Sequence, residues 1–281
     1  MSATSNVAVS QSYFSRFFAT LGASLAQLVR APSHSRRAEA ARRSAHHVLW
    51  LAAGSATVVI VLMVWLDVIE IRLMPPRGTA SLWAVRILTD FGKSAYLLWT
   101  LAVLLFAVLI VSAGVRATVR SLLLGLGTRL QFLFLAVLAP VLAGEAIKWM
   151  VGRGRPFVGG EANAFNFWHF AGSEAYASFP SGHAVTASAL AFAVSALWPR
   201  ARTAMLLYAI VIAATRLVLL AHHPSDVVAG ALVGVIGAMF VRYWFAARRL
   251  GFAISRDGTI VPLPGPSFER FKRVARRPFG P

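Results

Sequence analysis

The sequence predicts an all-α polytopic membrane protein in which six transmembrane helices form a bundle. The first observation is composition, because 58% of the 281 residues are hydrophobic and only 14% are charged. In soluble domains roughly 45–50% of the residues are apolar and about 25% are charged. The second observation is spacing, because apolar stretches alternate with polar turns along the chain. Each stretch is close to the roughly 20 residues that cross a bilayer.

The charge balance supports a membrane partner. The net charge of +18 arises from 28 Lys and Arg against 10 Asp and Glu. In a soluble chain such an excess would indicate a nucleic-acid partner. Here the cations lie mostly between apolar stretches, where they anchor and orient membrane helices. We therefore expect a membrane and no nucleic acid as partners, and the sequence leaves the oligomeric state open.

The first three spans are expected at 48–66, 95–115 and about 130–150. Trp50 and Trp65 lie near the ends of the first span, as interfacial anchors do. The polar loop that follows, 67–93, contains two prolines that break a helix. The third span is followed by a longer loop that continues to residue 179.

The last three spans are expected at 181–198, 204–221 and 227–245, so that residues 48–245 form the transmembrane domain. The basic tail, 246–281, contains several prolines and glycines, and we expect it to be mostly disordered. The basic N-terminal segment, 1–47, fits an amphipathic helix on the membrane surface or a frayed tail. Its apolar residues recur at helical spacing, at Tyr13, Phe14, Phe17, Phe18, Leu21, Leu25 and Leu28.

The cations are distributed unequally between the two sides of the predicted bundle. The N-terminal segment, the loops after spans two and four and the C-terminal end hold 20 of the 28 Lys and Arg. The opposite side holds seven, and the remaining one is Arg216. Lys and Arg are enriched in cytoplasmic loops. Both termini are therefore expected in the cytoplasm, and the loops after spans three and five face outward.

A polar stretch interrupts the apolar sequence between the last two spans. Arg216 lies inside span five, and His222 and Asp226 follow it closely. An ionisable group in such a place indicates a functional site by default. Arg binds oxyanions, His acts as a nucleophile or base, and Asp orients such a His. A short polar loop with Arg216 paired to Asp226 is the structural alternative.

Two further polar clusters lie at the ends of other spans. Lys148 and Arg155 lie on either side of the outer end of span three, where snorkelling anchors are the structural alternative. Ser181, Gly182 and His183 open span four. Free amides at a helix start bind anions, whereas an ordinary helix cap with an incidental His is the structural alternative.

The predicted topology puts all three clusters on the outward side, which predicts an active site at the outer membrane edge. Together they supply three cations, a hydroxyl, helix-end amides, histidines and a carboxylate. This set fits phosphoryl transfer, in which positioning and charge stabilisation provide most of the catalysis. No set of His, Asp and Glu has the spacing of a metal site, so neither a metal nor another cofactor is expected.

The three clusters resemble the three-part signature of the type-2 phosphatidic acid phosphatase superfamily, in its bacterial-type integral membrane branch. The matching pieces are Lys148-x6-Arg155-Pro156, Pro180-Ser181-Gly182-His183 and Arg216-x5-His222-x3-Asp226. Their order and internal spacings agree with the family pattern, and the resemblance covers roughly 48–245. One departure is Thr215, where the family pattern usually has Ser, and Thr keeps the hydroxyl.

The resemblance implies a metal-independent phosphatase that hydrolyses a lipid phosphomonoester or diphosphate through a phosphohistidine. His222 would attack phosphorus, Asp226 would hold the other ring nitrogen of His222, and His183 would protonate the leaving oxygen. The family spacing selects His222, whereas the physical argument alone leaves His222 and His223 open. The phosphate would be bound by Lys148, Arg155, Ser181, Gly182 and Arg216.

Several alternatives stay open at this point. Phosphatidate, phosphatidylglycerol phosphate, an isoprenyl diphosphate and lipid A all fit as substrates. A phosphotransferase that passes the group to another lipid is the enzyme alternative. A channel or transporter is the alternative of another class, although its charges would lie near the midplane of several spans. We expect the protein in a bacterial inner membrane, with its active site facing the periplasm.

Three neighbouring features also carry expectations. Glu145 precedes Lys148 by three residues and is expected to form a local ion pair with it. Asp90 and Lys93, late in the 67–93 loop, either cover the active site or are solvated. The aromatic residues after span three either guide an acyl chain or pack on the protein. They are Phe157, Phe165, Phe167, Trp168, Phe170 and Tyr176.

Overall fold

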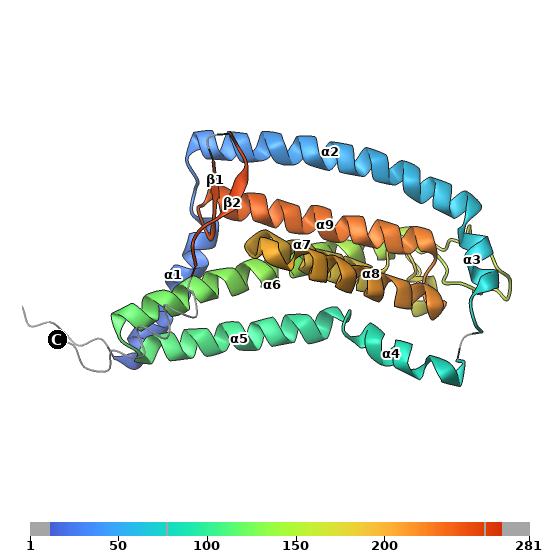
Figure 1. Ribbon diagram of the computed structural model, residues 1–281, viewed down its shortest axis with the longest axis horizontal. Helices are drawn as coiled ribbons and strands as arrows, with labels where there is room; N and C mark the ends of the chain where they lie inside the picture. The colour runs from blue at the N-terminus through green and yellow to red at the C-terminus, as the bar shows by residue number, and fades with distance from the viewer. Residues whose placement is uncertain (1–11, 77, 256, 266–281) are drawn as a thin grey trace, which may run out of the picture.

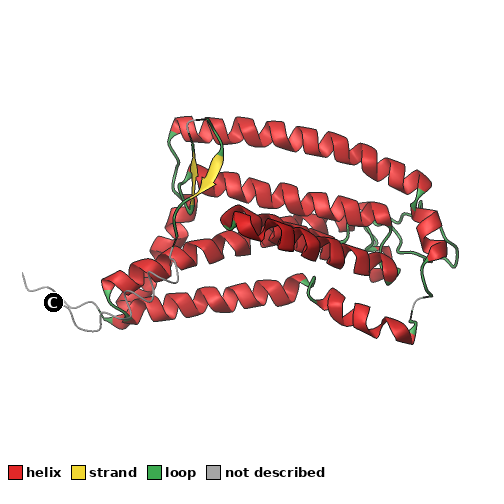
Figure 2. Cartoon of the chain, in the orientation of Figure 1, coloured by secondary structure: helices red, strands yellow, loops and turns green. Residues whose placement is uncertain are grey.

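Long helices lie side by side along one axis and form an elongated bundle (Figure 1). The structure is a computed structural model, and it describes residues 12–76, 78–255 and 257–265. Figure 2 shows that helices account for most of the described chain and that two short strands lie at one end. The prediction of a helical membrane protein is confirmed, except that the chain also contains these two short strands.

Five helical stretches among the described residues are long and apolar enough to cross a membrane. The expected fourth span is α7 (Gly182–Leu197), which is apolar but has only 16 residues. It is therefore shorter than the roughly 20 residues that cross a bilayer. The other expected spans lie in α2 (His34–Trp65), α5 (Ser94–Gly114), α6 (Ala117–Val151), α8 (Arg202–Val218) and α9 (Pro224–Ala247).

Several expected boundaries differ from the structure. Helix α2 begins at His34, within the segment assigned to the N-terminal region, and α6 begins at Ala117, well before residue 130. The 67–93 stretch is not a plain polar loop, because it contains α3 (Asp67–Leu73), η1 (Ala80–Leu82) and α4 (Trp83–Asp90). The charged residues of this stretch indicated a polar loop and not an apolar span, although helices readily carry charge on an exposed face.

The first helix, α1 (Tyr13–Val29), lies on the stretch that carries aromatic residues at helical spacing. It crosses the bundle at the end where α5 and α6 meet (Figure 1). The Tyr13 hydroxyl donates to the Ile110 carbonyl at 2.9 Å, and the rings of Phe17 and Phe106 meet edge to face. Helix α1 therefore packs on protein along this face.

Helix α7 lies at the centre of the bundle and packs closely against α9. A Cβ atom on Gly230 would lie 2.5 Å from the Ser181 carbonyl oxygen, and one on Gly234 would lie 2.4 Å from the Val185 carbonyl oxygen. Only glycine allows so close an approach, and small residues drive helix association in membranes. The Ser181 N–H donates to the Asp226 carbonyl at 3.0 Å, so the starts of α7 and α9 are tied together.

The chain after α9 turns back as a β-hairpin, in which β1 (Phe252–Ile254) pairs antiparallel with β2 (Ile260–Pro262). The expectation of a mostly disordered tail over 246–281 did not anticipate this ordered hairpin. The reason is Phe252, which is 1% exposed and whose ring lies 4.7 Å from that of Phe132 on α6. Burying such a side chain contributes about 1.5–3 kcal/mol. The rest of the tail, 266–281, lies outside the described residues.

Candidate active site

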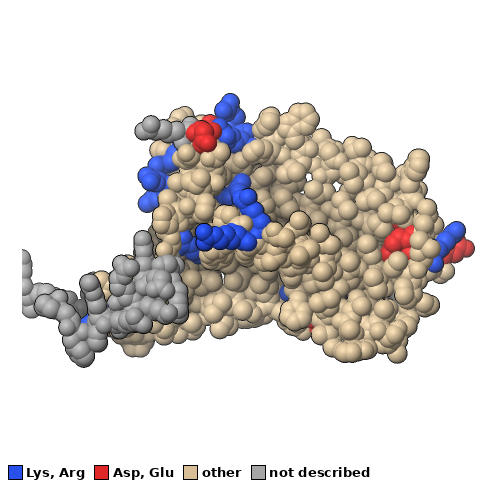
Figure 3. Space-filling view, in the orientation of Figure 1, with Lys and Arg blue, Asp and Glu red and all other residues tan. Residues whose placement is uncertain are grey.

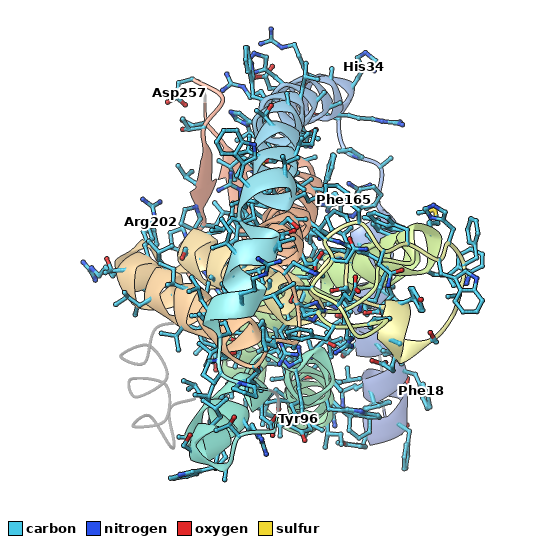
Figure 4. The ribbon with its side chains drawn as sticks, turned by 90° about the vertical axis from the view of Figure 1, so that its right-hand side faces the viewer. Phe18, His34, Tyr96, Phe165, Arg202 and Asp257 are labelled. Atoms are coloured by element: carbon cyan, nitrogen blue, oxygen red, sulfur yellow. The ribbon has the colours of Figure 1, made fainter. Side chains whose placement is uncertain are left out.

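The predicted site residues come from helix ends and loops at the end of the bundle that carries α3 and the start of α9 (Figure 1). Figure 4 looks onto this end, where many polar side chains lie between the helices and Phe165 lies on the loop that follows α6. The 3-10 helix η2 (Glu174–Tyr176) belongs to the same loop.

Asp226 is fully buried and accepts hydrogen bonds from several directions. Its Oδ2 accepts from the Ser178 hydroxyl at 2.5 Å, the His223 backbone N–H at 2.9 Å and His223 Nδ1 at 3.0 Å. Its Oδ1 accepts from Arg153 Nη1 at 2.6 Å. The bond to the His223 N–H also caps the start of α9, where a carboxylate is favoured by the helix dipole.

Arg153 and Asp67 were missed by the sequence argument, and they complete this buried network. Arg153 Nη2 donates to Asp67 Oδ2 at 2.7 Å, and both side chains are fully buried. The Ser225 hydroxyl donates to Asp67 Oδ2 at 2.5 Å and accepts from Arg153 Nη1 at 2.6 Å. One arginine thus holds two carboxylates. Among the described residues Asp226 is paired with Arg153, so the ion pair with Arg216 that we considered as an alternative is not found. A carboxylate directly after an apolar span was the available signal for Asp67.

The two neighbouring histidines differ in exposure and in hydrogen bonding. The His223 side chain is 0% exposed and bonds Asp226, whereas 4% of the His222 side chain is exposed. His222 Nδ1 lies 2.7 Å from the Ser178 carbonyl oxygen. Because a carbonyl only accepts, Nδ1 carries the proton and Nε2 keeps its lone pair. We expected Asp226 to hold the ring of His222, but its Oδ2 lies 4.0 Å from Nδ1 and Ser178 takes that position.

The electrostatic setting of His222 favours its neutral form. Burial lowers the pKa of His222 well below its usual range. The negative charge of Asp226 raises this pKa, while the positive charges of Arg216 and Arg155 lower it again. A neutral imidazole with a free Nε2 is the form that acts as a nucleophile.

The start of α7 presents polar groups that make no bond within the described chain. Ser181 Oγ and His183 Nε2 are both buried and have no hydrogen-bond partner there. A Cβ on Gly182 would lie 3.5 Å from Lys148 Nζ, so the lysine reaches the first turn of α7. Helix N-termini bind anions through free amides and the dipole, and the Lys148 ammonium lies at the same place beside the Glu145 carboxylate, whose Oε1 would be 3.7 Å from that Cβ.

The turn between α4 and α5 covers His183 and Arg216. Arg216 Nη1 donates to the Thr89 hydroxyl at 2.8 Å, and Thr215 Oγ1 donates to the same oxygen at 3.0 Å. A Cβ on Gly92 would lie 3.1 Å from the His183 ring, so this turn lies directly over the imidazole. Asp90 and Lys93 form an ion pair at 2.8 Å, and their charges act on His183. The turn itself thus lies over the site, as one expectation had it, while the Lys93 and Asp90 side chains are 41% and 43% exposed, as the other had it.

Lys148 and Arg155 both have carboxylate partners. Lys148 Nζ lies 2.5 Å from Glu145 Oε1, which confirms the expected local ion pair. Arg155 donates to the Glu174 carbonyl at 2.8 Å and to its carboxylate at 2.7 Å, and Glu174 is 91% exposed. Glu174 is 19 residues further along the chain, and no local spacing indicates it as the partner of Arg155. Because this carboxylate is in solvent, it can give way to a phosphate at little cost.

Taken together, these residues can hold an oxyanion next to an uncharged imidazole. Cationic side chains, the Ser181 hydroxyl and the first amides of α7 are suited to phosphate oxygens. The residues that hold Asp226 and the His222 ring are buried, so the imidazole of His222 is fixed before a ligand arrives. Such an arrangement is that of a membrane-embedded phosphatase.

Comparisons with known proteins agree with this class. Residues 129–250 match the family described as the PAP2 superfamily. A lipid A 1-phosphatase of Rhizobium johnstonii is 36% identical over 174 residues, which cover 61% of this chain and 71% of that protein. A lipid A 1-phosphatase of Rhizobium etli is 34% identical over 174 residues, 61% of this chain and 75% of that protein. No solved structure matches the chain.

The chain belongs to the PAP2 superfamily, the type-2 phosphatidic acid phosphatases. The resemblance read from the three motifs is thereby confirmed, and so is the prediction of a phosphatase. The alternative of a channel or transporter does not agree with these relatives.

Proposed function

We propose that the protein removes the 1-phosphate of lipid A, or of a closely similar phosphorylated glycolipid, at the outer face of a bacterial inner membrane. The observation that carries the proposal is the environment of His222. Its Nδ1 is held by the Ser178 carbonyl at 2.7 Å, and the charges of Arg216 and Arg155 act on its ring. The choice of lipid A follows the two relatives, both of which are lipid A 1-phosphatases.

In the proposed first step, His222 Nε2 attacks phosphorus and forms a P–N bond while the P–O bond to the sugar breaks. His183 gives a proton to the leaving sugar oxygen, and the phosphate dianion favours the charged form of His183 before that step. Asp226, 4.0 Å from His222 Nδ1, stabilises the positive charge that the ring gains. Water, activated by His183, then attacks phosphorus, releases inorganic phosphate and restores His222.

The cations of the site stabilise the equatorial oxygens in both steps. We assign Lys148, Arg155 and Arg216 to this role, with Ser181 and the Gly182 amide as hydrogen-bond donors. A cavity of about 230 Å³ lies beside Lys148 and is bounded by residues 172–177 of the following loop. Phosphate can approach the start of α7 through this opening.

An apolar cavity near the site suits the acyl part of a lipid. Its volume is about 420 Å³, and it lies at the α4–α5 turn that covers His183. Phe91, Tyr96 and Leu97 are among its lining residues. Each buried CH₂ group contributes about 0.8 kcal/mol, so a long-chain substrate is bound far better than a soluble ester. The exposed aromatic residues of the loop after α6 lie at the same end of the bundle.

The proposed topology has six crossings, with α7 as the short one. At 1.5 Å per residue its 16 residues cover about 24 Å. It is enclosed by α6, α8 and α9, so protein and not lipid surrounds most of it. Both termini then face the cytoplasm, and the site faces the periplasm.

The test is phosphate release from lipid A by the purified full-length protein in mixed micelles. We expect loss of the 1-phosphate, seen by mass spectrometry, with the 4′-phosphate retained and inorganic phosphate as product. His222→Ala should abolish turnover. The matched control is His223→Ala, which removes the neighbouring buried imidazole and should leave a measurable fraction of the activity. Phosphatidate and an isoprenyl diphosphate serve as competing substrates.

Three outcomes would contradict the proposal. Preference for phosphatidate by orders of magnitude would reject lipid A but keep the lipid phosphatase. Transfer of the phosphate to another lipid, without inorganic phosphate, would make the protein a phosphotransferase. Equal use of a short soluble phosphomonoester would show that the lipid part of the substrate is not recognised.

A further inference from the structure

A further cavity, lined by arginines and by apolar and aromatic residues, lies at the end of the bundle opposite the catalytic site. Its volume is about 430 Å³, and it is formed by the α1–α2 connection, the first turns of α2 and the last turns of α9. Helix α9 has 24 residues, so its two ends are about 36 Å apart. One end carries Asp226 and the other carries this cavity, which places the two sites at opposite faces of the membrane.

Three arginines meet at this cavity, two of them in its wall. Arg37 and Arg248 line it, and Arg30 Nη2 donates to the Arg248 carbonyl at 2.7 Å. Arg248 is 8% exposed, and its Nε makes no hydrogen bond within the described residues. Burial lowers the pKa of Arg248, and the charges of Arg37 and Arg30 lower it further. Three like charges so close together favour a bound anion.

The protein itself supplies no anion to this cluster within the described residues. No carboxylate is paired with Arg30, Arg37 or Arg248 there. The nearest acidic residue along α2 is Glu39, which pairs with Arg42 and Arg43 instead. Figure 3 shows Lys and Arg gathered at this end of the molecule. A buried cation without a carboxylate partner is costly unless a ligand compensates for it.

The other walls of the cavity are apolar and aromatic. Phe240, Tyr243 and Trp244 line it from α9, and Phe240 and Trp244 are about half exposed on the outside of the bundle. The Arg248 guanidinium lies over the Trp244 ring at 3.6 Å, and Trp244 Nε1 donates to the Leu28 carbonyl at 3.0 Å. Trp and Arg at such a position mark the headgroup level of a membrane. The cavity thus combines an anion site with an apolar wall that runs along the helix.

We propose that this cavity binds the phosphate of an anionic phospholipid in the leaflet opposite the catalytic site. The phosphodiester lies between Arg37 and Arg248, and one acyl chain follows Phe240 and Trp244 along α9. Basic pockets between transmembrane helices on the cytoplasmic side bind anionic headgroups in this way. The bound lipid is a structural ligand and not a substrate, because no histidine is among the described residues that line the cavity.

The test measures lipid binding by the purified full-length protein in neutral detergent micelles. Palmitoyl-oleoyl phosphatidylglycerol is titrated, and the rise in melting temperature gives an apparent dissociation constant. Each arginine near a lipid headgroup contributes about fivefold, so Arg37→Gln should weaken binding about fivefold. Arg42→Gln removes the same charge from the same helix but leaves the cavity intact, and it should bind as the unchanged protein does.

Two further measurements keep the test decisive. Phosphatase activity in micelles without phosphatidylglycerol should be unchanged in Arg37→Gln, which shows that the variant is folded. Arg248→Gln should also weaken binding, and if it fails to fold, Arg37→Gln decides alone. The expected ranking of ligands is phosphatidylglycerol well above phosphatidylcholine and above glycerophosphoglycerol, the headgroup without its chains.

The proposal is overturned if Arg37→Gln and Arg42→Gln bind phosphatidylglycerol equally well. Equal binding of phosphatidylcholine would show that the cavity does not select an anion. Equal binding of glycerophosphoglycerol would leave an anion site but reject a lipid. None of these results depends on the catalytic assignment, so they are independent of the proposed hydrolysis of lipid A.

Discussion

Replacing Arg153 by Met should destabilise the protein more than any other single change at this end of the bundle. Arg153 is fully buried and bonds Asp67 at 2.7 Å and Asp226 at 2.6 Å. Removing one partner of a buried ion pair costs about 3–5 kcal/mol, because it leaves a buried charge unpaired. Here two carboxylates are left, so we expect the upper part of that range. At about 2–4 °C per kcal/mol, the melting temperature should fall on the order of 10 °C.

The matched control lies two residues further along the chain. Arg155 pairs with Glu174, which is 91% exposed, so Arg155→Met should change stability by less than about 1 kcal/mol. Its effect should fall instead on phosphate binding, as a loss of activity in a protein that melts normally. Thermal unfolding in micelles, followed with phosphatase activity on the same samples, separates the two effects.

A double variant tests whether the charge, and not the shape, of Arg153 is responsible. Asp67→Asn removes one of the two carboxylates while Asn can still accept from the Ser225 N–H, a bond of 3.0 Å in the structure. Asp67→Asn together with Arg153→Met should therefore be more stable than Arg153→Met alone. An Arg153→Met protein that melts like the unchanged protein would refute the buried network, and so would a double variant that is simply additive.

The remaining predictions concern the catalytic histidine, the independence from metal ions, the pH dependence of stability and the orientation in the membrane. His222→Ala should abolish phosphate release while His223→Ala retains a measurable fraction, and the reverse order in an activity assay would exchange their roles. Activity should survive excess EDTA and be inhibited by vanadate, whereas recovery on adding Mg²⁺ would contradict a mechanism that uses only side-chain cations. Burial raises the pKa of Glu70 to about 7, with the charges of Asp67 and Asp226 acting in the same direction. The stability that Glu70 contributes is then full below about pH 4.5 and is lost as the pH rises through 7, so Glu70→Gln should raise the melting temperature at pH 8 and leave it nearly unchanged at pH 4. Cys introduced at Glu161 should react with an impermeant thiol reagent in intact cells, and Cys at Arg200 only after permeabilisation, because the native chain has no Cys; the opposite pattern would invert the topology.

The sequence by itself was enough for the class of protein and its family. The length of an apolar stretch predicts a membrane helix because the helix must cross the hydrocarbon core of the bilayer. Five of the six expected spans correspond to helical stretches that are long and apolar enough to do so. The spacing of His222 and Asp226 from Arg216 is local, so it can be read without knowing how distant helices pack. The Glu145–Lys148 pair was predictable for the same reason, because three residues along a helix bring side chains together.

Only the tertiary structure shows what surrounds these residues. Arg153 and Asp67 are 86 positions apart in the chain, and no local periodicity links them. The same holds for Thr89 beside Arg216, 127 positions away, and for the Ser178 carbonyl that holds His222. The hairpin after α9 exists because Phe252 reaches Phe132 on another helix, which a tail rich in charge and proline does not suggest. Local patterns follow from the chain and the bilayer, whereas a contact between distant segments depends on how every helix between them is packed.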